Sequence, residues 1–381
     1  MVIGIDGNEA NVEQKVGVSV YTASLLEQFH IKADKNLQFK IFLKKTPSPS
    51  LPSENNYFAY EIVRPSVLWS QVVLPLSLRK HNDLTVFFSP AHYAPRFCHV
   101  PYVVTIHDLS YLYYPNEFLK KDLYKLKNWT KYSVKRAKKV ICVSHTTKQD
   151  LMRFYSVPED KIEVVYNGYK KIVKHSKFNP STSLRIDGEQ SRTINVLSSR
   201  FKISAPYLLY VGTLQPRKNL TTLIKAFEMF KKTNPEFKLV IAGKKGWLYK
   251  HIFQTVKDLS LRKDVVFTGY VSDEELARFY RNAFCLVHPS LYEGFGIPIL
   301  EAMSYDCPVI ASNTSSLPEV GGDACLYFDP QNVGELFKKL LLLSENQTKR
   351  LELIQKGRQR IKLFSWEKCA TQTLDILKNV A

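Results

Sequence analysis

The chain has 381 residues, of which 45% are hydrophobic and 12% aromatic. This length exceeds what one hydrophobic core usually supports, so we expect two well-packed domains of about 100–200 residues each. Lys and Arg outnumber Asp and Glu by 54 to 35, which leaves a net charge of +19. Such an excess indicates an anionic partner, with a nucleotide, an acidic membrane surface and nucleic acid as candidates.

The sequence argues against a membrane-spanning protein and against one stabilised by disulfides or zinc. No apolar run approaches the ~18 residues that cross a bilayer, and the apolar segment in residues 1–6 is too short for a signal peptide. The cysteines form no C-x-x-C pair, which favours free thiols in a reducing cytosol. They are Cys98, Cys142, Cys285, Cys307, Cys325 and Cys369. The sequence predicts a cytoplasmic protein, soluble or peripheral on the inner face of the cell membrane.

In the first half of the chain, short apolar runs alternate with longer amphipathic segments, which is typical of a parallel sheet covered by helices. The predicted strands are residues 2–5, 39–43, 86–88, 102–106, 139–143 and 162–165. The predicted helices are residues 18–30, 68–81, 116–138 and 145–156. Residues 1–180 are therefore expected to form one doubly wound, Rossmann-like α/β domain.

The chain then enters a polar stretch with little periodicity, and we place a linker in it at residues 181–203. After this linker, apolar runs and amphipathic segments alternate a second time. The predicted strands are residues 207–211, 238–242, 265–268, 284–287, 308–311 and 325–328. Residues 204–364 thus predict a second Rossmann-like domain. Two such domains facing each other create a central cleft at the carboxyl ends of their strands, where ligands of these sheets bind.

The loop that contains Glu293 is the most informative stretch of the chain. Gly294 and Gly296 let the backbone approach a ligand, and Pro298 suits the first turn of a helix, so the loop offers amide donors to a phosphate. Glu293 and Glu301, on either side of the bend, can reach two parts of a nucleotide sugar. An ordinary strand-to-helix turn, with an acid favoured by the helix dipole, is the alternative.

Arg217 and Lys218 follow the predicted strand 207–211 and are candidates for clamping a diphosphate. A solvated surface pair is the alternative, which the position after a buried strand disfavours. The sequence contains no D-x-D pair of the kind that holds Mg²⁺ or Mn²⁺. We therefore expect leaving-group charge to be met by these side chains and by backbone amides, with no metal and no other cofactor.

Four further features lie in the first half. Gly17, before the first helix, is a candidate for approaching the diphosphate, or it marks a simple turn. His107 follows the strand 102–106, where imidazole can hydrogen-bond a sugar, or it is satisfied within the turn. His92 is interpreted as an ordinary loop residue.

The segment 116–139 is basic and rich in aromatic residues. It either lies on an anionic membrane through its lysines with Tyr124 or Trp129, or turns its aromatics to the core.

These residues together make the chain resemble the GT-B glycosyltransferases of the large retaining family 4, in particular its bacterial mannosyltransferase-like members. The resemblance covers nearly the full length. It rests on the Gly17 loop, Thr105–Asp108, Val143–Ser144, Tyr166–Gly168, Val211–Asn219, Gly269–Leu276, Tyr292–Glu301 and Phe364–Glu367. It implies that a last helix, residues 365–381, belongs structurally to the first domain. The long polar linker departs from the more compact family pattern.

The resemblance also implies residue roles. Glu293 would contact sugar hydroxyls, Glu301 the ribose, and His107 the transferred sugar. The diphosphate would be bound by Arg217 and Lys218 and by amides near Gly17, Gly294, Phe295 and Gly296, and the base by the backbone around Tyr270 and Val271.

The implied reaction moves a hexose, with retention and without metal, to a saccharide or lipid-linked saccharide in surface-polysaccharide synthesis. GDP-mannose is the preferred donor and UDP-sugars are the alternative. Three other classes remain open: a noncatalytic anion- or membrane-docking protein, a nucleic-acid binder, and a sugar epimerase or phosphorylase of the same architecture. The nucleic-acid binder is disfavoured because the positive charge is spread along the chain without a nucleic-acid motif.

Overall fold

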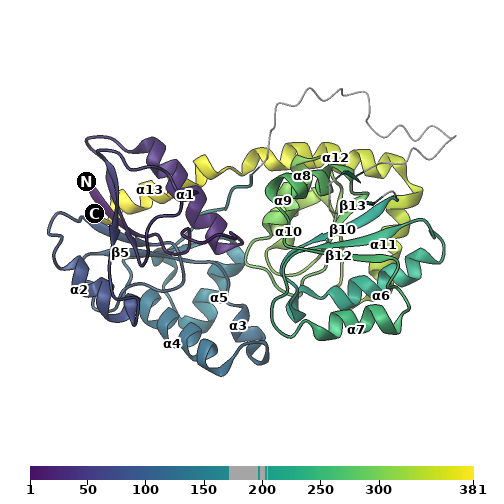
Figure 1. Cartoon of the computed structure of the whole chain (residues 1–381), viewed down its shortest axis with the longest axis horizontal. Helices are drawn as coiled ribbons and strands as arrows, with labels where there is room; N and C mark the ends of the chain where they lie inside the picture. Colours follow the sequence, from purple (N-terminus) through teal and green to yellow (C-terminus); the bar gives the residue numbers. More distant parts are fainter. Residues whose placement is uncertain (171–195, 198–201, 204) are drawn as a thin grey trace. The chain divides into compact units, whose positions relative to one another are not determined.

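The computed structural model describes residues 1–170, 196–197, 202–203 and 205–381, and the chain divides into two compact units (Figure 1). Unit 1 consists of residues 1–169, 293–297 and 363–381, and unit 2 of residues 170–292 and 298–362. The predicted linker, residues 181–203, lies almost wholly outside the described residues. Within it, only the short antiparallel pair β8 (Val196–Leu197) and β9 (Lys202–Ile203) is described.

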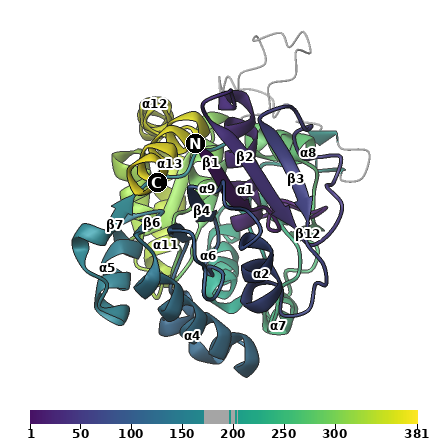
Figure 2. The same ribbon diagram turned by 90° about the vertical axis from the view of Figure 1, so that its left-hand side faces the viewer.

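Unit 1 is built on a seven-stranded parallel sheet with the order β3-β2-β1-β4-β5-β6-β7. Figure 2 shows β1, β2 and β3 side by side, as their pairing requires. The strands are β1 (Val2–Asp6), β2 (Gln38–Leu43), β3 (Phe58–Ile62), β4 (Val86–Ser89), β5 (Tyr102–Ile106), β6 (Lys139–Cys142) and β7 (Ile162–Val164). The order runs outward in both directions from the β1–β4 pair, which makes that pair the topological switch point of the sheet.

Helices cover both faces of this sheet because alternate strand residues point to opposite sides. Ile41 of β2 packs in one buried cluster, and its neighbour Phe42 packs in the other. The first cluster contains residues of α1 and α13, and these two helices lie against each other. The helices of unit 1 are α1 (Val18–Lys32), the π-helical turn η1 (Trp69–Val73), α2 (Leu74–Leu78), α3 (Ser110–Tyr113), α4 (Lys120–Arg136), α5 (His145–Tyr155) and α13 (Trp366–Val380).

Two expectations for unit 1 need correction. The strand β3 was not predicted, because its sequence Phe-Ala-Tyr-Glu-Ile lacks a continuous apolar run. It is an edge strand in which only Phe58 is buried. The helix predicted from residue 116 begins at Lys120 instead. Leu119 is extended, with φ −63° and ψ 138°, so the preceding segment forms α3 and a separate 3₁₀ turn at Pro115–Glu117.

Unit 2 repeats the architecture with a six-stranded parallel sheet in the order β12-β11-β10-β13-β14-β15. Its strands are β10 (Tyr207–Val211), β11 (Lys238–Ala242), β12 (Val265–Gly269), β13 (Cys285–His288), β14 (Val309–Ser312) and β15 (Cys325–Phe328). The switch point of this sheet lies between β10 and β13. All six strands fall within one residue of the segments that the apolar pattern predicts.

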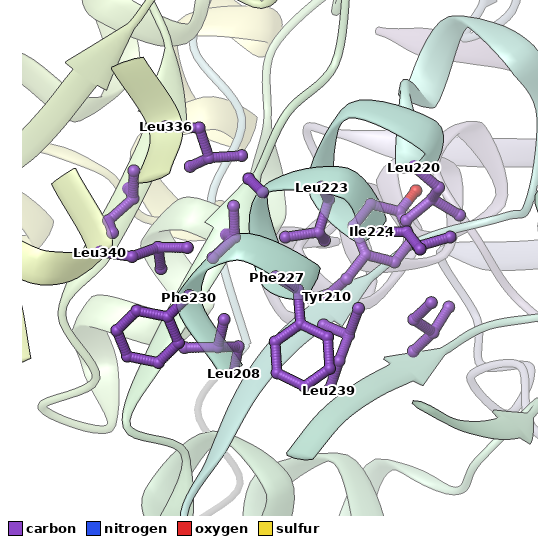
Figure 3. Packing of buried hydrophobic residues seen from close by; sticks show 14 of the residues in the cluster. Leu208, Tyr210, Leu220, Leu223, Ile224, Phe227, Phe230, Leu239, Leu336 and Leu340 are labelled. Atoms are coloured by element: carbon purple, nitrogen blue, oxygen red, sulfur yellow. The ribbon is translucent and has the colours of Figure 1, made fainter. Parts of the chain in front are cut away.

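The core of unit 2 forms where helices pack on this sheet (Figure 3). Leu208 of β10 and Leu239 of β11 lie beneath Phe227 and Phe230 of α6, with Leu336 of α11 beside them, and all are essentially fully buried. Each such side chain stabilises the fold by about 1.5–3 kcal/mol. The helices are α6 (Leu220–Lys231), α7 (Lys250–Asp258), α8 (Asp273–Asn282), α9 (Ile297–Ser304), α10 (Leu317–Gly321), α11 (Val333–Glu345) and α12 (Gln347–Arg360).

The predicted fold class, two Rossmann-like doubly wound domains, is confirmed by these two sheets. The last helix, α13, belongs to unit 1, and both chain termini lie in that unit near each other (Figures 1 and 2). All six cysteines are free thiols, and five of them are buried. None of the helices in the described part of the chain is both long and apolar enough to cross a membrane.

Candidate active site

The switch point of unit 2 brings Arg217 close to the loop that leads to Glu293. The chain leaves β10 into a 3₁₀ turn, Pro216–Lys218, and leaves β13 at His288. The amide of Leu291 donates to the carbonyl of Arg217 at 2.8 Å, and the Arg217 guanidinium donates to the carbonyl of Tyr292 at 3.5 Å. Two loops that follow adjacent strands are thus joined, with the two neighbouring cations, Arg217 and Lys218, on one of them.

Asn219 holds this arrangement, a role that the sequence reasoning missed. Its side-chain amide donates to the carbonyls of Pro289 at 3.1 Å and Pro330 at 2.7 Å. Its φ of 55° is left-handed, a conformation that Asn adopts more readily than most residues. An Asn directly after an Arg-Lys pair and directly before a helix was the available signal for a residue that shapes the turn.

Glu301 lies in α9 with its carboxylate inside the protein. The hydroxyl of Tyr280 in α8 donates to Glu301 Oε2 at 2.8 Å. Burial raises the pKa of Glu301 to about 7, although the Tyr280 hydrogen bond lowers it. A side chain held near its point of half-ionisation can accept from ligand hydroxyls once it loses its proton. Tyr270 and Val271 directly follow β12, two strands away from β10 in the same sheet.

The segment 293–297 belongs to unit 1, where Gly294 lies against His107. A Cβ on Gly294 would be within 1.8 Å of the carbonyl oxygen of His107, so only glycine fits there. The hydroxyl of Thr147 donates to the His107 carbonyl at 3.3 Å, and it lies 3.5 Å from the Gly294 carbonyl. Glu293 and Phe295 on either side are buried. The sequence placed Gly294 at a ligand; the structure shows that its close backbone neighbour is His107.

His107 is a neutral, fixed imidazole. Its Nε2 lies 2.7 Å from the carbonyl of Pro90, which can only accept, so Nε2 carries the proton and Nδ1 does not. Burial lowers the pKa of His107 to about 4. The ring of Tyr21 meets it edge-on, with centroids 4.7 Å apart. The neighbouring Asp108 accepts from the amide and the hydroxyl of Ser110, at 2.9 and 2.7 Å.

Gly17 is the N-cap of α1 and has φ 52° and ψ −113°, a conformation that side chains disfavour. A Cβ at this position would meet no atom within 4 Å, so the backbone conformation and not crowding requires the glycine. Because glycine has no side chain, no N-cap side chain accepts from the backbone amides in the first turn of α1. The open surroundings leave the Gly17 backbone accessible.

The predicted site residues thus fall into two sets. Arg217, Lys218, Tyr270, Val271 and Glu301 lie in unit 2. Gly17, His107, Glu293, Gly294, Phe295 and Gly296 lie in unit 1. Among the described residues, no group of three His, Cys, Asp or Glu side chains is placed to hold a metal ion.

Family models and curated relatives match most of the chain. Residues 195–360 match the model described as "Glycosyl transferases group 1", and residues 17–170 match "Glycosyltransferase Family 4". The chain is 32% identical to the O-antigen chain mannosyltransferase B of Escherichia coli, over 79% of this chain and 76% of the relative. It is 33% identical to the O-antigen chain mannosyltransferase RfbU of Salmonella typhimurium, over 60% of this chain and 57% of the relative.

Solved structures share the fold at lower identity. A sucrose-phosphate synthase from Thermosynechococcus elongatus superimposes with a TM-score of 0.74 at 19% identity, covering 99% of this chain and 98% of that one. WaaG, a glycosyltransferase involved in lipopolysaccharide biosynthesis, superimposes with a TM-score of 0.72 at 16% identity, covering 99% of each chain. With two Rossmann-like sheets, two matching family models and these relatives, the chain belongs to the group 1, family 4 glycosyltransferases of GT-B fold.

Proposed function

We propose that the protein transfers a hexose, mannose by preference, from a nucleotide-diphosphate sugar to a saccharide or lipid-linked saccharide during synthesis of a cell-surface polysaccharide. The donor is GDP-mannose, with UDP-sugars as the second choice. The choice of mannose and of polysaccharide synthesis rests on one observation, the similarity to two O-antigen mannosyltransferases, one of them over 79% of this chain. Family membership removes the support for a noncatalytic docking protein or a nucleic-acid binder.

Arg217 and Lys218 bind the donor diphosphate in this proposal. Their position at the switch point of unit 2 supports the assignment, because ligands of such sheets bind outside the carboxyl ends of the strands there. Arg offers a planar fork of donors and Lys a compact charge, so together they stabilise the diphosphate as it leaves. Backbone amides of Gly17, Gly294, Phe295 and Gly296 add further donors.

Glu301 binds the ribose and the segment Tyr270–Val271 binds the base. The raised pKa of Glu301 supports the first role, since two ribose hydroxyls would replace the water that burial has removed from its carboxylate. Ribose binding then favours the ionised form. Donor binding near neutral pH is therefore accompanied by proton release, which is measurable by calorimetry in buffers of different ionisation enthalpy.

The transfer itself proceeds with retention by front-face displacement. The acceptor oxygen forms its bond to the anomeric carbon on the face from which the diphosphate departs, and its proton passes to the departing phosphate oxygen. His107 is neutral and accepts at Nδ1, so it orients a sugar hydroxyl and does not supply positive charge. Glu293 contacts sugar hydroxyls. No metal ion takes part, since Arg217 and Lys218 meet the charge on the leaving group.

The helix α4 supplies a contact with an anionic membrane surface. Lys120, Lys121 and Lys125 lie on it, and Tyr124, with Leu119 just before it, is largely exposed, at 65% and 74% respectively. Lysines with exposed apolar side chains are the composition of a helix that lies on lipid headgroups. This contact would hold the protein beside a lipid-linked acceptor.

One assay tests the proposal. The purified protein is incubated with GDP-mannose, UDP-glucose or UDP-galactose and a saccharide acceptor, with EDTA and with Mn²⁺, and the product linkage is read by NMR. We expect transfer from GDP-mannose, an α-anomeric product and equal rates in both solutions. An inverted anomer would overturn the mechanism, loss of turnover in EDTA with recovery in Mn²⁺ would overturn metal independence, and no transfer from any donor would overturn the function.

A further inference from the structure

Unit 1 has its own switch point, between β1 and β4, and most of the side chains that follow these strands have no role in the site described above. Glu9 follows β1, and His92 and Tyr93 follow β4. Ligands of open parallel sheets bind outside the carboxyl ends of the strands where the order reverses. These three residues therefore occupy the position in unit 1 that Arg217 occupies in unit 2.

An aromatic pair stands at this position. The rings of Tyr93 and Trp129, a residue of α4, meet at 77° with their centroids 5.4 Å apart. Both side chains are only partly buried. An aromatic face that solvent still reaches can stack against the C–H face of a hexose, while the phenol of Tyr93 remains available to a hydroxyl.

Carboxylates accompany the aromatic pair. The pKa of Tyr93 is raised by burial and further by the negative charges of Asp122 and Glu9. Burial also raises the pKa of Glu9, even though solvent reaches its side chain. Carboxylates accept strongly from sugar hydroxyls, but two of them beside a phenol repel a phosphate or an acidic sugar. One cation is also near, since the Lys125 ammonium lies 5.7 Å from the centroid of the Trp129 ring. Two carboxylates against this single cation leave surroundings that favour an uncharged hexose over an anionic one.

His92 adds a polar atom that lacks a partner. Its Nδ1 is buried and makes no hydrogen bond to any described residue. Its ring lies 5.8 Å from the ring of His107, at 67°. Burial lowers the pKa of the His92 imidazole and so favours its neutral form. Buried polar atoms are nearly always hydrogen-bonded, so this nitrogen needs a partner. A hydroxyl of a bound ligand can be that partner. The sequence reasoning had treated His92 as an ordinary loop residue.

We propose that Glu9, His92, Tyr93 and Trp129 form a subsite in unit 1 that binds an uncharged hexose of the saccharide acceptor. This inference rests on the proposed function, because it names the chemistry of the molecule that receives the transferred sugar. Tyr93 and Trp129 stack on the ring, and Glu9 and His92 bind its hydroxyls.

The test uses octyl α-glycosides of mannose, glucose and galactose as probes, with three variants of the full chain. Glu9→Gln removes the charge, His92→Phe keeps a ring and removes its nitrogens, and Trp129→Ala removes the stacking surface. We expect each to raise the KM for the preferred glycoside by about 10- to 100-fold, the effect of losing one hydrogen bond to a charged group or one large contact. Donor affinity and hydrolysis of the donor without acceptor should stay within twofold.

Glu13→Gln is the matched control, since Glu13 is an exposed carboxylate in the same loop as Glu9. It should leave the KM unchanged. Glycoside binding is also measured without donor, by saturation-transfer NMR. If the wild type neither binds nor uses any of the three glycosides, or if Glu9→Gln and Trp129→Ala both keep the wild-type KM, the subsite is wrong. If glycosides bind but no nucleotide sugar does, the subsite stands and the proposed function fails.

Discussion

At the scale of single residues, the role of Lys218 gives the most direct prediction. Lys218→Ala removes a positive charge beside the proposed leaving group, and we expect turnover to fall by about 100- to 1,000-fold, the range for losing one preorganised stabilising group. The melting temperature should change by less than about 3 °C. Steady-state kinetics and a thermal melt are the measurements. Lys225→Ala in α6 is the control, because Lys225 is exposed on the same stretch of chain. Near-normal turnover in Lys218→Ala would contradict the clamp.

Glu301 predicts an unusual pH dependence of stability. Its pKa is about 7 in the folded state against 4.5 for an ordinary glutamate, so between these values the folded chain holds a proton that the unfolded chain releases. Stability is therefore lost as pH rises through this window, by up to about 3 kcal/mol for this one group. Glu301→Gln should raise the free energy of unfolding by about 1–3 kcal/mol at pH 8, and change it little at pH 4.5. Denaturant titrations at both pH values measure this.

The same substitution should weaken donor binding. Gln cannot become an anion, so it loses the charge-assisted hydrogen bonds proposed for the ribose. A variant that is more stable and yet binds nucleotide less tightly would identify Glu301 as a residue kept for binding at the expense of stability. Unchanged affinity for GDP, measured by calorimetry, would remove Glu301 from the donor site.

At the scale of elements, the contact between the loop after β7 and the start of α13 is sterically tight. A Cβ on Gly168 would lie 2.2 Å from the backbone nitrogen of Trp366. Because this atom belongs to the backbone, it cannot move aside as the end of a flexible side chain could. Gly168→Ala should therefore lower the free energy of unfolding by about 1–3 kcal/mol. Gly334→Ala in α11 is the opposite case. Its Cβ would meet only Asn332 Oδ1 at 3.5 Å, so this change should be neutral or stabilise by up to about 1 kcal/mol. Thermal melts compare the two.

The strands show why some elements could be predicted and others not. Buried central strands such as β10 and β11 read as continuous apolar runs, and their predicted bounds match the structure. The edge strand β3 contains Glu61 and owes its conformation to pairing with β2, which no local pattern reveals. The helix α4 begins at Lys120, and not at residue 116 as predicted, because the backbone of Leu119 is extended. The amphipathic pattern of the segment does not reveal the conformation of this one residue.

The candidate site was predictable in part for a similar reason. Arg217, His107 and Glu293 follow buried strands, so an apolar run followed by a polar residue locates them. Their supports were not predictable, because they come from distant parts of the chain. Tyr280 reaches Glu301 from another helix, and Asn219 reaches Pro330, 111 residues away. Long-range hydrogen bonds of this kind leave no mark on local composition.

At the scale of the whole molecule, the net charge of +19 predicts binding to anionic lipid. The protein should sediment with vesicles containing phosphatidylglycerol at low salt and be released near 0.5 M salt, because screening shortens the reach of the lysines. Exchanging Lys120, Lys121 and Lys125 for Glu should abolish sedimentation, whereas the same exchange at Lys338 and Lys339 of α11 should not. Sedimentation that persists in the first variant would show that α4 is not the contact.

The division of the chain into units has a consequence for biosynthesis. Unit 1 takes residues from three separate stretches, and Cys369, Ala370, Leu374 and Leu377 of α13 complete one of its buried clusters. On the ribosome, the sheet of unit 1 is made first, but that cluster cannot close until α13 has been synthesised. Unit 2, whose own described strands and helices all precede residue 363, can finish sooner. Unit 1 thus begins to be synthesised before unit 2 and is completed after it.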